Sequence, residues 1–236
     1  MTELATPSPA ELAALFEGLR VSDVRDGMDW AGLHNKGSVS PDIAPLFQGA
    51  KVCGPAHTIR HRLSEKVVPP MSPEEYTTWA YSYWYKELYS YPLEKHLKRG
   101  EVVVVESPPG VAVGEIGSNN SLSWYAAGAA GIVTSGGVRD RDECILQRVP
   151  IFCRTRAQCM VQGRIEFDAA QIPVNIGGVL VRPGDIVVGD GDGVVIVPIE
   201  HAEVVAKYAR QELEKDKAGR RKLYERLGWE LDETVR

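Results

Sequence analysis

The sequence predicts a layered α/β domain built on a mixed β-sheet, with a small helical piece before the sheet and a long helix after it. Three observations support this fold class. Residues 1–46 carry helical patterns, residues 47–199 mix strand and helix patterns, and residues 200–236 are charged and helical. This order favours helices layered on a sheet rather than a regular βαβαβ series. We expect residues 1–236 to form one domain.

The N-terminal piece is expected to contain two helices. Residues 7–20 place apolar side chains on one stripe of an amphipathic helix, namely Leu12, Leu15, Phe16 and Leu19. Ser22 then suits the cap of a second, short helix that runs to Met28. Residues 47–60 alternate and contain Gly49 and Gly54, which indicates a strand or a hairpin.

An aromatic segment follows, and residues 76–97 of it are expected to form a helix. Its aromatic side chains are Trp79, Tyr81, Tyr83, Trp84, Tyr85, Tyr89 and Tyr91. They fall around most of the helix circumference, so we expect other parts of the fold or a neighbouring subunit to cover them.

The central elements alternate between strand and helix. The valine run of residues 100–106 predicts a buried strand. Residues 117–140 read as a polar turn, a small-residue helix over 122–128, a strand over 131–134 and a glycine turn at Ser135-Gly136-Gly137. Residues 140–146 then look helical, and residues 149–153 form another short strand.

The C-terminal third begins as a β meander. Residues 172–198 contain three apolar β segments separated by turns at residues 182–185 and 191–193. Residues 200–228 predict a single charged helix, long enough to reach another subunit.

Composition limits the partners of this chain. The net charge is −5 and the isoelectric point is near 5.6, which argues against nucleic acid as the main ligand. The basic run Arg220-Arg221-Lys222 reads as a solvated helix face, and the aromatic segment lacks the basic residues that single-strand binding needs. No segment is apolar enough to span a membrane, and residues 1–12 do not resemble a signal peptide. We expect a cytoplasmic protein.

The four cysteines, Cys53, Cys144, Cys153 and Cys159, form no CxxC pair, so buried reduced thiols are favoured over disulfides or zinc. The segment Asp190-Gly191-Asp192-Gly193 favours a hairpin turn over calcium, because it lacks further oxygen ligands. The histidines show no HExxH or triad spacing. His57 and His61 lie near a strand end that could face a cleft, although a structural role is favoured for both.

The chemistry of the chain is expected between Gly117 and Asp140. The turn Gly117-Ser118-Asn119-Asn120 leaves backbone N–H groups free at a helix start, which suits either a helix cap or an anion. Arg139 and Asp140 read as a surface ion pair or helix cap, or as a functional pair. In the functional reading, Arg139 binds a carboxylate and Asp140 supplies the hard oxygen that Mg²⁺ prefers.

These segments resemble the RraA-like family, which includes the class II 4-hydroxy-4-methyl-2-oxoglutarate aldolases and the regulator of ribonuclease E activity. The resemblance covers most of the chain, from SDVRDGMDWAG through GAKVCGPAHTIR, GEVVVVE, AAGAAGIVTSGGVRD and VPIFCR to IPVNIGGVLVRPGDIVVGDGDGVVIVP. It implies an α/β/β/α-type sandwich that assembles as a homotrimer or a dimer of trimers, with sites at the subunit interfaces.

The resemblance also implies roles for particular residues. Arg139 would bind the pyruvate end of a small 2-oxo acid and steady its enolate, while Asp140 would anchor Mg²⁺ or Mn²⁺. The backbone amides of residues 117–120 would hold the substrate. A carboxylate from a neighbour's C-terminal helix assists in the family, and Glu212 and Glu214 are the candidates for it here.

One departure from the family pattern affects the proton chemistry. Aldolase members carry an acidic residue 21 positions before the arginine, and that position is Ser118 here. A serine hydroxyl cannot replace a carboxylate as a base at neutral pH. Glu115, three residues earlier, is an alternative acid.

The leading hypothesis is a divalent-metal-dependent lyase. It would release pyruvate from a 4-hydroxy-2-oxo acid by retro-aldol cleavage, or decarboxylate oxaloacetate. Two alternatives remain open: a non-catalytic regulator that acts through its surface, and a related lyase or isomerase acting on another hydroxy acid, with the aromatic segment setting specificity.

Overall fold

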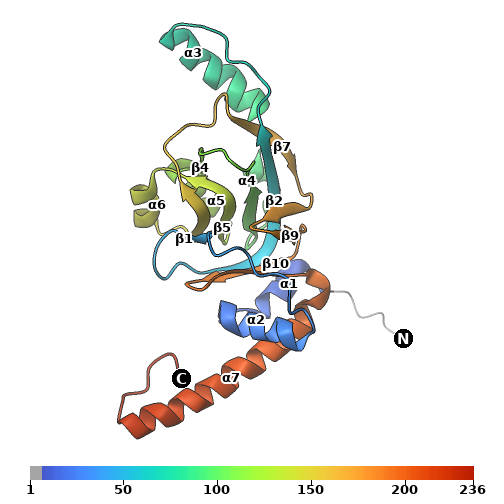
Figure 1. Ribbon diagram of the computed structural model, residues 1–236, viewed down its shortest axis with the longest axis vertical. Helices are drawn as coiled ribbons and strands as arrows, with labels where there is room; N and C mark the ends of the chain where they lie inside the picture. Colours follow the sequence, from blue (N-terminus) through green and yellow to red (C-terminus); the bar gives the residue numbers. More distant parts are fainter. Residues whose placement is uncertain (1–6) are drawn as a thin grey trace, which may run out of the picture.

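The computed structural model describes residues 7–236, and Figure 1 shows a central sheet with an aromatic arm at one end and a long helix at the other. Residues 1–6, on which the signal-peptide expectation partly rests, lie outside the described part. Among the described residues, no helix combines the length and apolar character needed to cross a bilayer.

The predicted mixed sheet is confirmed. Its main path runs in the order β1 (Ala44–Pro45), β6 (Ile151–Arg156), β5 (Gly131–Val138), β3 (Val102–Glu106), β2 (Val52–Leu63), β10 (Ile186–Asp190) and β11 (Gly193–Val197). Strands β2, β3, β5 and β6 are parallel, whereas β10 pairs antiparallel with both β2 and β11. The segment at residues 47–60 is therefore one long strand, β2, and not a hairpin.

Three shorter pieces complete the β structure. Strand β4 (Gly114–Ile116) pairs parallel with the end of β5, and β7 (Ile165–Ala170) pairs antiparallel with the end of β2. Strands β8 (Val174–Ile176) and β9 (Val179–Val181) form a separate hairpin. The meander predicted over residues 172–198 is thus confirmed as β8 to β11.

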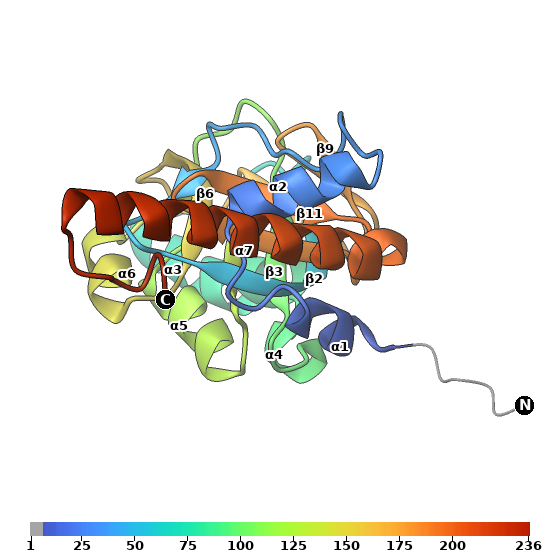
Figure 2. The same ribbon diagram turned by 90° about the horizontal axis from the view of Figure 1, so that it is seen from below.

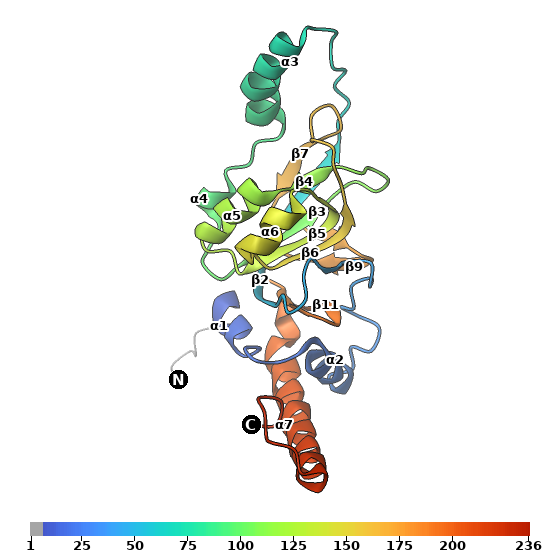
Figure 3. The same ribbon diagram turned by 90° about the vertical axis from the view of Figure 1, so that its left-hand side faces the viewer.

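The expected α/β/β/α layering is also confirmed. Helices α4 (Leu93–His96), α5 (Ser118–Ala126) and α6 (Arg141–Gln147) cover one face of the parallel strands (Figure 3). Their other face packs through valine, isoleucine and phenylalanine side chains onto β10 and β11. Helices α1 (Pro9–Ala14), α2 (Val21–Trp30) and α7 (Ala202–Leu227) form the outer layer beyond β10 and β11, with α7 running alongside α2 (Figure 2).

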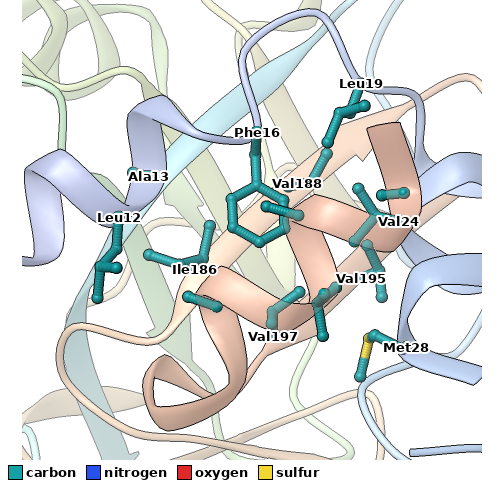
Figure 4. Close-up of a cluster of buried hydrophobic side chains, with 14 of the residues drawn as sticks. Leu12, Ala13, Phe16, Leu19, Val24, Met28, Ile186, Val188, Val195 and Val197 are labelled. Carbon is teal, nitrogen blue, oxygen red and sulfur yellow. The ribbon is translucent and has the colours of Figure 1, made fainter. Parts of the chain in front are cut away.

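The outer layer is held by a second apolar core. Phe16, Met28 and Val188 are buried within it, and Figure 4 shows Phe16 lying over strands β10 and β11. Gly27 lets α2 approach α7, because a β-carbon there would lie 2.5 Å from the carbonyl oxygen of Val205. The single long helix predicted for residues 200–228 is confirmed as α7 after a short 3-10 turn (Ile199–His201), and it ends at Gly228 with φ 67°.

The N-terminal helices differ in extent from the prediction. Helix α1 is shorter than residues 7–20, because the chain turns after Ala14 and Gly18 adopts a φ of 77°. Helix α2 begins before Ser22, and the carboxylate of Asp23 accepts the N–H of Arg20, which takes the capping position expected of Ser22. Apolar spacing identifies the helices but not their caps.

The aromatic segment is not one helix. It consists of α3 (Pro73–Trp79), a π-helix η1 (Ala80–Leu88) and the separate α4 after Pro92. Together α3 and η1 form an arm that projects from the body (Figures 1 and 3). Trp84 is fully buried at its base, whereas Tyr81 is 67% exposed. The described part of this chain therefore covers Trp84 and partly covers Trp79, Tyr85 and Tyr89, but leaves Tyr81 exposed.

The predicted glycine turn at Ser135-Gly136-Gly137 is wrong, because these residues continue strand β5. A β-carbon on Gly136 would lie 2.3 Å from the Oε1 atom of Glu115, and one on Gly137 would lie 2.4 Å from the carbonyl oxygen of Val113. The glycines therefore serve the close approach of neighbouring segments within a strand and do not make a turn.

All four cysteines are free. Cys144 and Cys153 are buried and Cys53 is partly buried, but Cys159 is exposed, so burial holds for only part of the set. Burial raises the pKa of Cys53 and of Cys153 to about 11.

Candidate functional site

Arg139 and Asp140 lie where strand β5 ends and helix α6 begins. Asp140 adopts left-handed backbone angles, φ 52° and ψ 40°, which turn the chain sharply from strand to helix. The Nε atom of Arg139 is 3.3 Å from Oδ1 of Asp140, and the two side chains are 35% and 36% exposed. The pair is therefore accessible to a ligand, as the carboxyl end of a parallel strand in an α/β sheet commonly is.

The loop Gly117-Asn120 lies directly against this pair. The N–H of Ser118 donates to Oδ2 of Asp140 at 3.3 Å, and the N–H of Arg139 donates to the carbonyl of Ile116 at 2.8 Å. A β-carbon on Gly117 would lie 2.7 Å from Oδ2 of Asp140. The structure thus brings together the two segments in which the sequence places the chemistry.

A third glycine completes this close fit. A β-carbon on Gly114 would lie 2.6 Å from Cβ of Arg139, so the arginine side chain lies flat against strand β4. Glycines at positions 114 and 117 allow the arginine and the aspartate to sit against backbone. The sequence identified Gly117 but not Gly114, because the pairing of β4 with β5 is a non-local contact.

Helix α5 begins at Ser118, so the predicted loop forms its first turn. The side chain of Asn120 serves as its cap, accepting the N–H groups of Gly117 (2.7 Å) and Ser121 (3.0 Å) and donating to the carbonyl of Glu115 (2.9 Å). The N–H groups of Asn119 and Asn120 have no acceptor among residues 7–236. Free N–H groups at a helix start favour an anion. Here the helix start adjoins Arg139, because a β-carbon on Gly117 would lie 3.4 Å from Cγ of Arg139.

Glu115, on β4, lies in a buried polar cluster. Its carboxylate accepts hydrogen bonds from Nδ1 of His61 at 2.8 Å, from Oγ of Ser107 at 3.0 Å and from Oγ1 of Thr134. The residue is only 3% exposed. The carboxylate therefore contacts this cluster and not Asp140, and its link to the pair runs through the β4 backbone.

The aromatic arm closes over the cluster. The ring of Tyr89 stacks on His61 with centroids 4.9 Å apart, and Tyr85 meets Tyr89 edge-on. Burial, and then the charge of Glu115, raise the pKa of Tyr89 well above its ordinary value. Burial also raises the pKa of Tyr85, partly offset by the positive charge of Arg139. Tyr85, Tyr89 and the cluster are functional candidates that the sequence did not connect to the site.

Glu212 and Glu214 do not reach the site within one chain. They lie on α7, on the far side of the sheet from α5 and α6 (Figure 1). Glu212 accepts the indole N–H of Trp30 at 3.1 Å, and Glu214 faces Lys217. A role for either one at the site requires a neighbouring subunit.

The Arg139–Asp140 site fits a divalent cation that takes few of its ligands from the protein. Asp140 offers an accessible carboxylate, and no group of three or more His, Cys, Asp or Glu side chains with metal-binding geometry occurs in the described chain. Mg²⁺ typically keeps several waters and binds through one or two carboxylates plus substrate oxygens. Asp140 could hold such an ion with water and substrate as the other ligands.

Another cleft lies elsewhere on the molecule. It has a volume of about 670 Å³ and is lined by residues 34–38, the β8–β9 hairpin and residues near His201. None of Arg139, Asp140 or residues 117–120 lines it. Because the side chains of Arg139 and Asp140 are both partly exposed, the surface around them is open in a single chain.

Comparison with known proteins places this geometry in context. The family model described as Aldolase/RraA, of the RraA-like group, matches residues 21–196. A Halalkalibacterium halodurans protein, provisionally named 4-hydroxy-4-methyl-2-oxoglutarate aldolase, is 27% identical over 207 residues, covering 87% of this chain and 85% of that protein. The Legionella pneumophila protein DlpA is 27% identical over 184 residues, 78% of this chain, but the match spans only 27% of its length.

A solved structure shows the same fold. The crystal structure of RraAS2 from Streptomyces coelicolor, described as an unusual member of the RNase ES inhibitor RraA protein family, superposes with a TM-score of 0.71 and 26% identity. The superposition covers 92% of this chain and 98% of that one. Residues 21–196 include every residue of the Arg139–Asp140 site described above.

Proposed function

The chain belongs to the RraA-like family, and from this premise we propose that it is a carbon–carbon lyase acting on a small 2-oxo acid at Arg139 and Asp140. The observation that carries the proposal is the meeting of Arg139, Asp140 and the free N–H groups of Asn119 and Asn120 at one accessible place. Relatives named as 4-hydroxy-4-methyl-2-oxoglutarate aldolases support the reaction class.

The substrate would enter with its carboxylate first. The N–H groups of Asn119 and Asn120 and the guanidinium of Arg139 are all donors, and a carboxylate with its neighbouring 2-oxo oxygen presents only acceptors to them. Arg139 would then stabilise the negative charge that develops on the 2-oxo oxygen as a bond to carbon 3 breaks. The reaction is either retro-aldol release of pyruvate from a 4-hydroxy-2-oxo acid or decarboxylation of oxaloacetate.

Asp140 is the proposed ligand of a divalent cation, Mg²⁺ or Mn²⁺. When bound, such an ion supplies Lewis-acid polarisation of the 2-oxo group. Asp140 is itself oriented by the N–H of Ser118 and by Arg139, which fixes the carboxylate beside the anion-binding turn. Both charges of the pair would therefore act on the same end of the substrate.

The open surface around the pair favours an oligomer in which a neighbouring subunit completes the site. Glu212 or Glu214 of a neighbour's α7 would then supply a further carboxylate. Trimer and hexamer are the assemblies that we propose, on the family resemblance.

Substitution at the pair tests the proposal. We expect Arg139→Ala and Asp140→Ala each to lower metal-dependent pyruvate release by about 10²-fold or more, the usual cost of losing one electrostatic donor. Asp142→Ala, on the exposed first turn of α6, is the matched control and should keep full activity. Wild-type activity in either Arg139→Ala or Asp140→Ala would contradict the assignment.

A second function, a non-catalytic regulator, is favoured by one observation. Ser118 stands where the family's aldolases carry an acid, and the structural relative RraAS2 is described within an inhibitor family. Calorimetric titration with Mg²⁺, Mn²⁺ and pyruvate separates the two functions. Binding of a cation and of the oxo acid supports the lyase, whereas binding of neither supports the regulator.

A further inference from the structure

His61 and Glu115 form a buried ionic or hydrogen-bonded pair at the carboxyl end of the parallel strands. Nδ1 of His61 lies 2.8 Å from Oε2 of Glu115, and the side chains are 7% and 0% exposed. An ionised carboxylate can only accept hydrogen bonds, so the proton lies on Nδ1. The lone pair of a neutral His61 ring is therefore on Nε2.

Nε2 of His61 is left without a hydrogen-bond partner among the described residues. The histidine four residues earlier on the same face of β2 shows the contrast. Both ring nitrogens of His57 are engaged, Nδ1 with Glu101 and Gln171 and Nε2 with the hydroxyl of Tyr91, and the residue is 0% exposed. His57 is a satisfied core histidine, whereas His61 is 8% exposed and keeps one nitrogen free.

The pair adjoins the Arg139–Asp140 site through two structural links. Glu115 lies between Gly114, which packs on Arg139, and Gly117, which packs on Asp140. On the arm, Tyr89 stacks on His61, and Tyr85, four residues earlier on η1, meets Tyr89 edge-on. The positive charge of Arg139 partly offsets the rise in the pKa of Tyr85. The backbone of β4 and one turn of the arm therefore join His61 to the proposed substrate site.

The proposed reaction needs a group that carries a proton, and the residues at the pair do not supply one. The guanidinium of Arg139 only donates hydrogen bonds, the carboxylate of Asp140 accepts from Ser118 and Arg139 and would hold the proposed cation, and the Ser118 hydroxyl is too weak a base. A histidine held by a carboxylate on one nitrogen and free on the other is a common general acid–base arrangement.

We propose that His61, oriented by Glu115, transfers the proton in the reaction at Arg139 and Asp140; this inference rests on the proposed lyase function. In the retro-aldol direction, Nε2 takes the proton of the 4-hydroxyl group. The O–H electron pair forms the new carbonyl bond, the C3–C4 bond breaks, and its electron pair becomes the enolate that Arg139 stabilises. The proton then returns from Nε2 to carbon 3 and gives pyruvate.

Glu115 acts in this scheme as a positioning residue. Its carboxylate fixes the ring tautomer and stabilises the protonated ring that forms during transfer. Ser107 and Thr134 hold the carboxylate in turn, and the charged groups packed around His61 are Glu115 from β4 and, beyond Phe167 on β7, the Arg62–Glu166 ion pair. Tyr89, which follows η1, faces the ring, and burial raises its pKa well above the ordinary value.

The experiment measures exchange of the methyl protons of pyruvate with D₂O by NMR, with Mg²⁺ or Mn²⁺ present, because this exchange reports the enolate step without the aldol substrate. We expect His61→Asn to slow the exchange by about 10²-fold or more while pyruvate affinity, measured by calorimetry, stays within about threefold. Glu115→Gln should show a smaller loss and an altered pH profile. His34→Asn, at an exposed site, should match the wild type.

A second variant distinguishes chemistry from folding. His61→Ala leaves space for a free imidazole, and added imidazole should restore exchange at least tenfold in a variant whose thermal melting stays cooperative. Exchange by His61→Asn within threefold of the wild type overturns the role of His61 and leaves the lyase intact. Loss of pyruvate affinity without imidazole rescue also overturns it. A wild type that neither exchanges pyruvate protons nor releases pyruvate overturns the lyase and this inference together.

Discussion

The carboxylate of Glu115 occupies the space beside the Cα atom of Gly136, so closely that a β-carbon there would lie 2.3 Å from its Oε1 atom. The same β-carbon would lie 2.7 Å from Oγ of Ser107. Strand β5 therefore accommodates a buried, three-times hydrogen-bonded carboxylate only because it has no side chain at this position.

We expect Gly136→Ala to destabilise the protein by about 1–3 kcal/mol, the usual cost of overpacking a core. The measurement is the free energy of unfolding in urea. Gly219→Ala is the control, because nothing lies within 4 Å of that position in α7, and replacing a helical glycine should stabilise by up to about 1 kcal/mol. Equal effects of the two substitutions would contradict the packing described for Gly136.

Alanine substitutions of the neighbouring residues Asn119 and Asn120 should differ in their effect on stability. The Asn120 side chain makes three hydrogen bonds that cap α5, so Asn120→Ala should cost roughly 0.5–2 kcal/mol of stability and weaken pyruvate binding. Asn119 is exposed and its side chain makes none, so Asn119→Ala should change stability by less than about 0.5 kcal/mol. Thermal melting of both variants checks this, and a larger loss for Asn119→Ala would be inconsistent with the cap.

These residues show what sequence patterns can and cannot predict. The turn at Gly117 and the Arg139–Asp140 pair are short local motifs that sequence patterns can indicate, and the structure brings them into contact. The sequence Ser135-Gly136-Gly137 predicts a turn when only neighbouring residues are considered. The structure instead requires glycine at position 136 because the side chain of Glu115 lies against it. Contacts that depend on strand pairing are not visible in local composition.

The thiols should differ in reactivity. Burial raises the pKa of Cys53 and Cys153 to about 11, so at pH 8 these groups are protonated and shielded, whereas Cys159 is exposed. We expect iodoacetamide at pH 8 to label Cys159 within the native protein and the other three cysteines only after unfolding. Peptide mass spectrometry gives the answer, and rapid native labelling of Cys153 would show that β6 is less protected than described.

His57 should contribute to loss of stability in acid. Burial is the main cause that lowers its pKa below 6.5, so the unfolded chain binds a proton first as the pH falls. The stability that depends on a neutral His57 is complete above about pH 6.5 and is lost as the pH falls below it, by at most roughly 1.4 kcal/mol per pH unit. Between pH 6.5 and 5, the unfolding free energy of His57→Gln should therefore fall less steeply than that of the wild type.

His34→Gln is the control for this slope, because His34 is exposed and should leave the pH dependence unchanged. The same slope in wild type and His57→Gln would mean that other groups account for the acid sensitivity.

Most strands and the long C-terminal helix could be predicted from the sequence. Runs of valine indicate β3, β10 and β11, and the long charged helical pattern of residues 200–228 indicates α7, because each pattern is continuous along the chain. The aromatic arm was not predictable in its shape, because the single helix expected over residues 76–97 is divided into α3, η1 and α4. The sequence places His61 only near a strand end and favours a structural role for it. Its pairing with Glu115 spans 54 positions and arises from the fold.

Arg139 and Asp140 are proposed to form the site of a metal-dependent lyase. The most direct measurement is pyruvate release by the wild-type protein from a panel of 4-hydroxy-2-oxo acids and oxaloacetate, with Mg²⁺ or Mn²⁺ and with EDTA. We predict release from at least one substrate that EDTA abolishes and added cation restores. No release from any substrate under any of these conditions, by a folded protein, would contradict the claim.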